Sequence, residues 1–178
     1  LIDSVASELD SDCVGVLATP ATVSSGAYRR AIHACHPHAQ VLEVGCPAFV
    51  PLIEAGDLQD PALEREALAY LAPLLAAGVD TVVMGCTHYP MLRSLLAGLL
   101  PPHVRLVDPA ASAVRRLGPL LASMGGMPEG ELGGVEVVPP ALRTRVCVSG
   151  QAGAFAEAAS RWLGYRPAVE RVDLRSVA

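Results

Sequence analysis

One ten-residue segment of the chain carries four side chains that could take part in acid–base chemistry. Residues 81–90 read TVVMGCTHYP, so an apolar run is followed by a thiol, a hydroxyl, an imidazole and a phenol. Such a run predicts a buried strand, and open parallel sheets bind ligands at the carboxyl ends of their strands. Pro90 predicts a helix start, whose partial positive charge would favour a Cys86 thiolate. His88 is close enough to exchange a proton with this thiol or to supply positive charge.

Strand patterns and helix patterns alternate along the rest of the chain. Short apolar runs predict strands at 13–18, 41–45, 81–84, 104–107, 145–148 and 169–172. Helical spacing of apolar residues predicts helices at 1–9, 26–35, 47–54, 60–78, 90–100, 110–124 and 152–163. Residues 19–25 are predicted to form a polar turn, and the glycine-rich stretch 125–134 a flexible connector. This alternation predicts an α/β protein with a mostly parallel sheet.

Composition excludes several classes of protein. The 178 residues include 13 basic and 18 acidic side chains, a net charge of −5, with 52% apolar and 17% charged residues. A chain of this kind buries a core, and it lacks the basic surface that binds nucleic acid. No apolar stretch approaches the roughly 18 to 20 residues of a membrane span, and no signal peptide is recognisable. We therefore expect a cytoplasmic protein, without nucleic-acid or membrane partners, whose five cysteines are free thiols.

Two other groups of residues suggest alternative chemistry. His33, Cys35, His36 and His38 are residue types that bind zinc, but Pro37 would break the helix before His38. We expect a solvated helix end there and no metal site.

Cys46 stands among apolar neighbours and is expected to be a structural cysteine. A thiol hydrolase built on Cys86 and His88 is a weaker hypothesis, because nucleophile and base usually come from separate segments.

Several segments together resemble the glutamate racemases of the cofactor-independent aspartate/glutamate racemase superfamily. They are VGVLATPATVSSGAY (14–28), CPAFVPLIEAG (46–56), GCTHYP (85–90), LVD (106–108) and RWLGYRPAVERVDL (161–174). The resemblance implies two α/β domains that face each other across an active site. Residues 1–12 would be a leading helix, 13–107 the second domain, and 108–178 the returning part of the first.

The resemblance also implies a role for each site residue. Cys86 would be one of two thiols that remove and return the α-proton on opposite faces of glutamate, assisted by His88. Thr87 would bind the substrate carboxylate, Thr22 would approach the substrate, and Glu54 would support the opposite thiol. No cofactor and no metal would be needed, and the product D-glutamate would supply peptidoglycan synthesis. A homo-oligomer is possible.

The family's first catalytic-cysteine motif, alanine-cysteine-asparagine-threonine, does not occur in these 178 residues. We therefore expect this polypeptide alone to be inactive as a racemase, and residues 108–178 to expose apolar surface that favours self-association. A non-catalytic dicarboxylate-binding or interaction module of the same fold, and an aspartate racemase, are the alternative functions.

Overall fold

The computed structural model describes residues 2–123 and 145–174, which belong to two compact units, residues 1–128 and 129–178. The strands of the first unit are β1 (Cys13–Ala18), β2 (Gln40–Gly45), β3 (Thr81–Met84) and β4 (Arg105–Val107). Its helices are α1 (Ile2–Ala6), α2 (Pro20–Ser25), α3 (Ala27–Cys35), α4 (Phe49–Ala55), α5 (Pro61–Ala76), the 3-10 helix η1 (Tyr89–Leu92), α6 (Arg93–Leu99) and α7 (Pro109–Ser123). The predicted connector at 125–134 lies outside the described residues.

The four strands form one parallel sheet in the order β2-β1-β3-β4. Parallel neighbours need crossover connections, which the helices supply. All four carboxyl ends therefore meet at one edge of the sheet, where the chain leaves β1, β2, β3 and β4. The predicted parallel α/β fold is confirmed in this unit.

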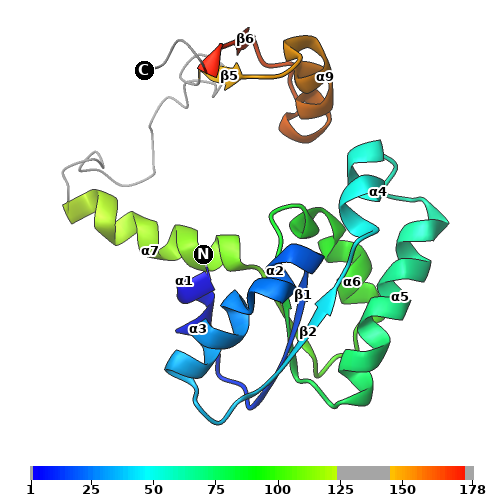
Figure 1. Cartoon of the computed structure of the whole chain (residues 1–178), viewed down its shortest axis with the longest axis vertical. Helices are drawn as coiled ribbons and strands as arrows, with labels where there is room; N and C mark the ends of the chain where they lie inside the picture. The colour runs from blue at the N-terminus through cyan, green and yellow to red at the C-terminus, as the bar shows by residue number, and fades with distance from the viewer. Residues whose placement is uncertain (1, 124–144, 175–178) are drawn as a thin grey trace. The chain divides into compact units, whose positions relative to one another are not determined.

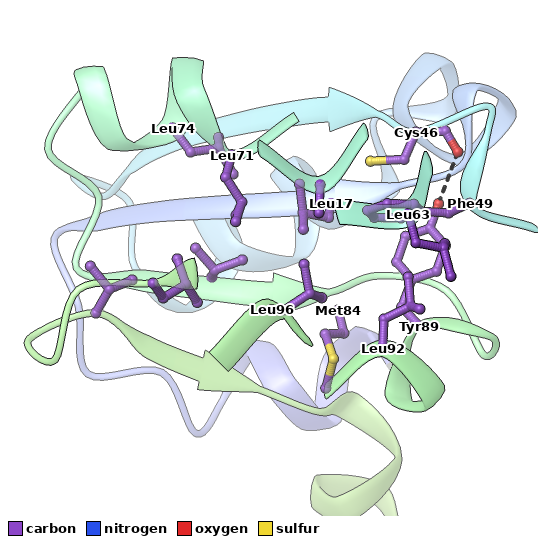
Figure 2. Packing of buried hydrophobic residues seen from close by; sticks show 14 of the residues in the cluster. Leu17, Cys46, Phe49, Leu63, Leu71, Leu74, Met84, Tyr89, Leu92 and Leu96 are labelled. Atoms are coloured by element: carbon purple, nitrogen blue, oxygen red, sulfur yellow. Dashed lines mark hydrogen bonds between the residues drawn. The ribbon is translucent and has the colours of Figure 1, made fainter. Parts of the chain in front are cut away.

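Helices cover both faces of the sheet (Figure 1). One face carries Leu17, Val82 and Met84, which belong to the apolar core formed with α4, α5, η1 and α6 (Figure 2). The other face carries Val14, Val16 and Val83, which pack with α1 and α3. Because side chains alternate along a strand, these mostly apolar runs supply both cores at once.

Helix α5 shows how local sequence determines an element. The Asp60 carboxylate accepts the Ala62 N–H at 2.8 Å and Pro61 occupies the first turn, so the start of the helix is capped. Buried residues follow at helical spacing, and Gly78, at φ +73°, lies just beyond the helix end.

The second unit is described separately. Strands β5 (Val146–Val148) and β6 (Val169–Arg171) form a parallel pair, connected by helix α9 (Ala152–Leu163). Arg145 and Glu170 form an ion pair with two hydrogen bonds of 2.9 Å. No helix in the described parts of the two units is long and apolar enough to cross a membrane.

Two sequence predictions about elements are wrong. Residues 20–25 form helix α2 rather than a turn, because the Thr19 hydroxyl accepts the Thr22 N–H and Pro20 suits the first helical position. Residues 90–100 do not form one α-helix: η1 begins at Tyr89, and the α-helical part starts only at Arg93. The predicted domain limits at 12/13 and 107/108 remain predictions.

Candidate functional site

The loop that leaves β3 is held at both ends. At its start, the Gly85 N–H donates to the Leu17 carbonyl at 2.7 Å, which keeps the chain against β1. At its end, the Tyr89 hydroxyl donates to the Cys46 carbonyl at 3.3 Å (Figure 2). The Tyr89 ring is fully buried and packs edge-on against Phe49, with 5.2 Å between ring centroids. The intervening residues, 86–88, are therefore presented from a firmly anchored turn.

A thiol, an imidazole and a carboxylate form a chain of contacts on this turn. Cys86 Sγ lies 3.9 Å from His88 Nδ1, and His88 Nε2 lies 3.1 Å from Glu54 Oε1. Both ring nitrogens of His88 thus have a partner, so the imidazole is oriented between sulfur and carboxylate. The His88 side chain is 33% exposed and that of Glu54 is 65% exposed, which leaves the pair open to solvent. This arrangement can pass a proton to or from the Cys86 sulfur.

Cys86 also borders a cavity of about 520 Å³ at the carboxyl edge of the sheet. The residues that line it are Ile2, Asp3, Thr22, Tyr28, Met84, Gly85, Cys86, Thr87, Pro90, Asp108, Pro109 and Ala110. Since all of these residues belong to the first unit, the cavity lies within one compact body. The half-buried thiol beside an open space is the arrangement that a base acting on a bound small molecule requires.

The structure brings together the residues singled out from the sequence. Cys86, Thr22 and Thr87 line the cavity, while His88 and Glu54 lie beside Cys86 without being among the lining residues. The resemblance associated Glu54 with an opposite thiol, whereas its carboxylate contacts His88, on the side of Cys86. The hydroxyls of Thr22 and Thr19 lie 2.9 Å apart, which orients the Thr22 side chain.

Sequence reasoning missed three ionisable lining residues, Asp3, Tyr28 and Asp108. Burial, together with smaller contributions from the nearby Cys86 and Asp108, raises the pKa of the Tyr28 phenol to about 12. Tyr28 therefore presents an uncharged hydroxyl at neutral pH. Asp108 could have been found from the rule that parallel sheets bind ligands at the carboxyl ends of their strands, because Asp108 directly follows β4, as Gly85 follows β3. Tyr28 closes the 14–28 motif, but no spacing rule directs it to this cavity.

Cys46 is 1% exposed, and burial raises the pKa of its thiol to about 12. The expectation of a structural cysteine is confirmed by this burial.

The ring Nε2 atoms of His33 and His36 each lie 3.1 Å from a backbone carbonyl, those of Ala39 and Ala6. No group of three or more metal-binding side chains is assembled within residues 2–123 or 145–174.

The chain is also similar to known proteins. A curated glutamate racemase of Synechococcus sp. (strain CC9605) is 48% identical over 172 residues, which are 95% of this chain and 62% of the relative. The structure superposes on the glutamate racemase of Francisella tularensis, determined in complex with D-glutamate, with a TM-score of 0.79 and 29% identity. For the glutamate racemase of Thermus thermophilus the TM-score is 0.77 and the sequence identity is 32%.

In both structural comparisons the match covers 98% of this chain and 62% of the other. The chain thus spans less than two thirds of the length of these relatives. Residues 3–117 match the Asp/Glu/Hydantoin racemase family, and this region contains Cys86, His88, Glu54 and every residue that lines the cavity except Ile2. The chain therefore belongs to the Asp/Glu/Hydantoin racemase family.

Proposed function

We propose that this chain supplies one of the two acid–base groups of a glutamate racemase, with Cys86 as the reacting thiol. The observation that carries the proposal is the contact between Cys86 Sγ and His88 Nδ1 at the edge of a cavity, with Glu54 on the far side of the imidazole. Relatives at up to 48% identity that bear the name glutamate racemase support it.

In the proposed reaction the Cys86 thiolate takes the α-proton from one face of the substrate, and a proton returns from the opposite face. For the other enantiomer the direction reverses, so that Cys86 begins as a thiol and donates. His88 exchanges the proton between the sulfur and solvent, while Glu54 stabilises the imidazolium form. In this proposal Thr22 and Thr87, which line the cavity, donate hydrogen bonds to a substrate carboxylate.

Among the described residues, Cys86 is the only cysteine that lines the cavity. Inversion needs a second group on the other face, so we expect these 178 residues to exchange the α-hydrogen without sustained racemisation. The domain limits, with 13–107 as the second racemase domain and 108–178 as the returning part of the first, belong to this proposal. So do a cytoplasmic location, a possible homo-oligomer and the supply of D-glutamate for peptidoglycan.

A dicarboxylate-binding module without catalysis is the second candidate, favoured by the single lining cysteine. Aspartate is the alternative substrate, because an acidic amino acid with a shorter side chain would satisfy the same groups at Cα.

Exchange of the α-hydrogen tests the catalytic proposal. Glutamate of each configuration is incubated with the chain in deuterated buffer; loss of the α-proton signal is followed by NMR and optical rotation by circular dichroism. We expect exchange of one enantiomer, abolished in Cys86→Ala and retained in Cys35→Ala, which removes an exposed thiol that does not line the cavity. Binding of glutamate without any exchange would support the non-catalytic module instead, and faster exchange of aspartate would support an aspartate racemase.

A further inference from the structure

Among the residues that the structure describes, the ionisable side chains that line the cavity beside Cys86 can all carry negative charge and none can carry positive charge. Those that line it are Asp3, Tyr28, Cys86 and Asp108, and no lysine, arginine or histidine is among its lining residues in the described part of the chain. The only charge that these side chains can carry is negative. A ligand with a positive group therefore gains the most from this lining, whereas its carboxylates must rely on hydroxyl and backbone N–H donors.

Of the two lining carboxylates, Asp3 and Asp108, that of Asp108 is better placed to bind a ligand. It directly follows β4, at the same sheet edge as the turn that carries Cys86, and its side chain is half-buried. Its Oδ1 atom accepts the Ala110 N–H at 2.9 Å, and its carbonyl accepts the Ser112 N–H at 3.4 Å. These bonds fix the carboxylate at the start of α7. Asp3 is exposed on the short helix α1.

Asp108 and Cys86 lie within electrostatic reach of the same phenol. Both negative charges raise the pKa of Tyr28, whose own side chain is 4% exposed and lines the cavity with them. Since Cys86 and Asp108 line one cavity of about 520 Å³, a small ligand with its α-carbon at the Cys86 sulfur shares this space with the Asp108 carboxylate. Tyr28, uncharged at neutral pH, adds a phenol to the same lining.

We infer that Asp108 binds the ammonium group of the ligand and makes this cavity selective for α-amino acids over 2-hydroxy acids of the same carbon skeleton. The inference rests on the proposed function for the position of the α-carbon, but it concerns recognition rather than proton transfer. A fixed carboxylate forms a charge-assisted hydrogen bond with an ammonium group, whereas a hydroxyl in its place makes only a weaker one.

Binding to the 178-residue chain tests the inference without turnover. Dissociation constants for glutamate and 2-hydroxyglutarate are measured by titration calorimetry for the unsubstituted chain and for Asp108→Asn. Asparagine keeps the helix cap, so the fold is preserved while the charge is lost. We expect glutamate affinity to fall about 10-fold or more, from the strength of hydrogen bonds to charged groups, and 2-hydroxyglutarate affinity to change little.

The matched control is Asp57→Asn, since Asp57 accepts the Gln59 N–H at 2.9 Å in the same i to i+2 pattern but does not line the cavity. It should leave both affinities unchanged. Asp108→Ser, which also caps a helix without charge, replaces the first variant if that one does not fold by circular dichroism.

Equal losses for both ligands, or none, would overturn the inference, as would an unsubstituted chain that binds neither ligand or prefers 2-hydroxyglutarate. Failure of the proposed function looks different: selective, Asp108-dependent binding would persist while Cys86→Ala left α-hydrogen exchange unaltered.

Discussion

Replacing Gly85 by alanine should both destabilise the first unit and disturb the Cys86 turn. A Cβ atom at this position would lie 2.8 Å from the Leu17 carbonyl oxygen, 3.1 Å from Ala18 Cβ and 3.1 Å from Tyr28 Cε2. The Leu17 oxygen is backbone and already accepts the Gly85 N–H at 2.7 Å, so it cannot move aside without losing that bond. Overpacking of this kind costs about 1 to 3 kcal/mol. In a chain of this size the melting temperature should fall by roughly 2 to 12 °C.

Gly98→Ala is the matched control, because no atom lies within 4 Å of a Cβ at that position in α6. Alanine inside a helix is favoured over glycine by about 0.5 to 1 kcal/mol, so this variant should be slightly more stable. Thermal unfolding is followed by circular dichroism, and the rate of Cys86 alkylation is measured in parallel. A Gly85→Ala protein with unchanged melting temperature and unchanged Cys86 reactivity would refute the idea that this close approach positions the thiol.

Three further predictions concern the cap, the imidazole and the buried thiol. Asp60→Ala removes the bond to the Ala62 N–H and should lower the free energy of unfolding by about 0.5 to 2 kcal/mol in urea titrations; an unchanged midpoint and slope would contradict the assigned cap. His88→Ala removes the imidazole that contacts the Cys86 sulfur and should slow alkylation of Cys86 about tenfold or more near pH 7.5. The alkylation rate is measured by peptide mass spectrometry, and equal rates in the two proteins would show that the contact does not affect the reactivity of Cys86. Burial raises the pKa of Cys46 from 9.0 to about 12, so above pH 9 the unfolded chain loses this proton first. The protonated Cys46 thiol therefore makes its full contribution to the free energy of unfolding below pH 9, and this contribution is lost as the pH rises towards 12, by up to about 4 kcal/mol. In urea unfolding between pH 8 and 11, the free energy of unfolding should fall correspondingly less for Cys46→Ala than for the unsubstituted chain.

The strands were predictable because each is a short apolar run bounded by turn residues. The limits of β1 and β3 agree with the sequence prediction at both ends, since burial on both faces leaves an uninterrupted apolar signal. Helix α2 was missed because five of its six residues, PATVSS, are weaker helix formers than alanine and none of its side chains is buried. The signal that could have found it was the pair Thr19-Pro20, a capping residue followed by proline.

From residue spacing alone, the candidate site was predictable only where neighbours in sequence are neighbours in space. The spacing in residues 85–90 placed Cys86 and His88 together at a strand end, and the structure gives their contact at 3.9 Å. Glu54 lies 34 residues from His88, and their pairing depends on how α4 packs against the turn. A spacing pattern carries no information on such a contact, and resemblance alone associated Glu54 with the opposite thiol.

Most of the large apolar side chains that are exposed lie after Ala110, the last residue in the sequence that lines the cavity. Of the large apolar side chains that are exposed, Leu68 precedes residue 108, whereas Val114, Leu117, Leu120, Phe155, Trp162, Leu163 and Leu174 follow it. This is the exposure expected from the sequence for residues 108–178, and β5 with β6 is a two-stranded parallel sheet, a form that rarely stands uncovered. The four-stranded sheet, by contrast, has a helical layer on each face, and all the residues that line the cavity belong to the same unit as this sheet. Recognition by Asp108 and proton transfer by Cys86 should therefore survive substitutions that make the exposed residues of α9 polar, whereas self-association of the chain should not.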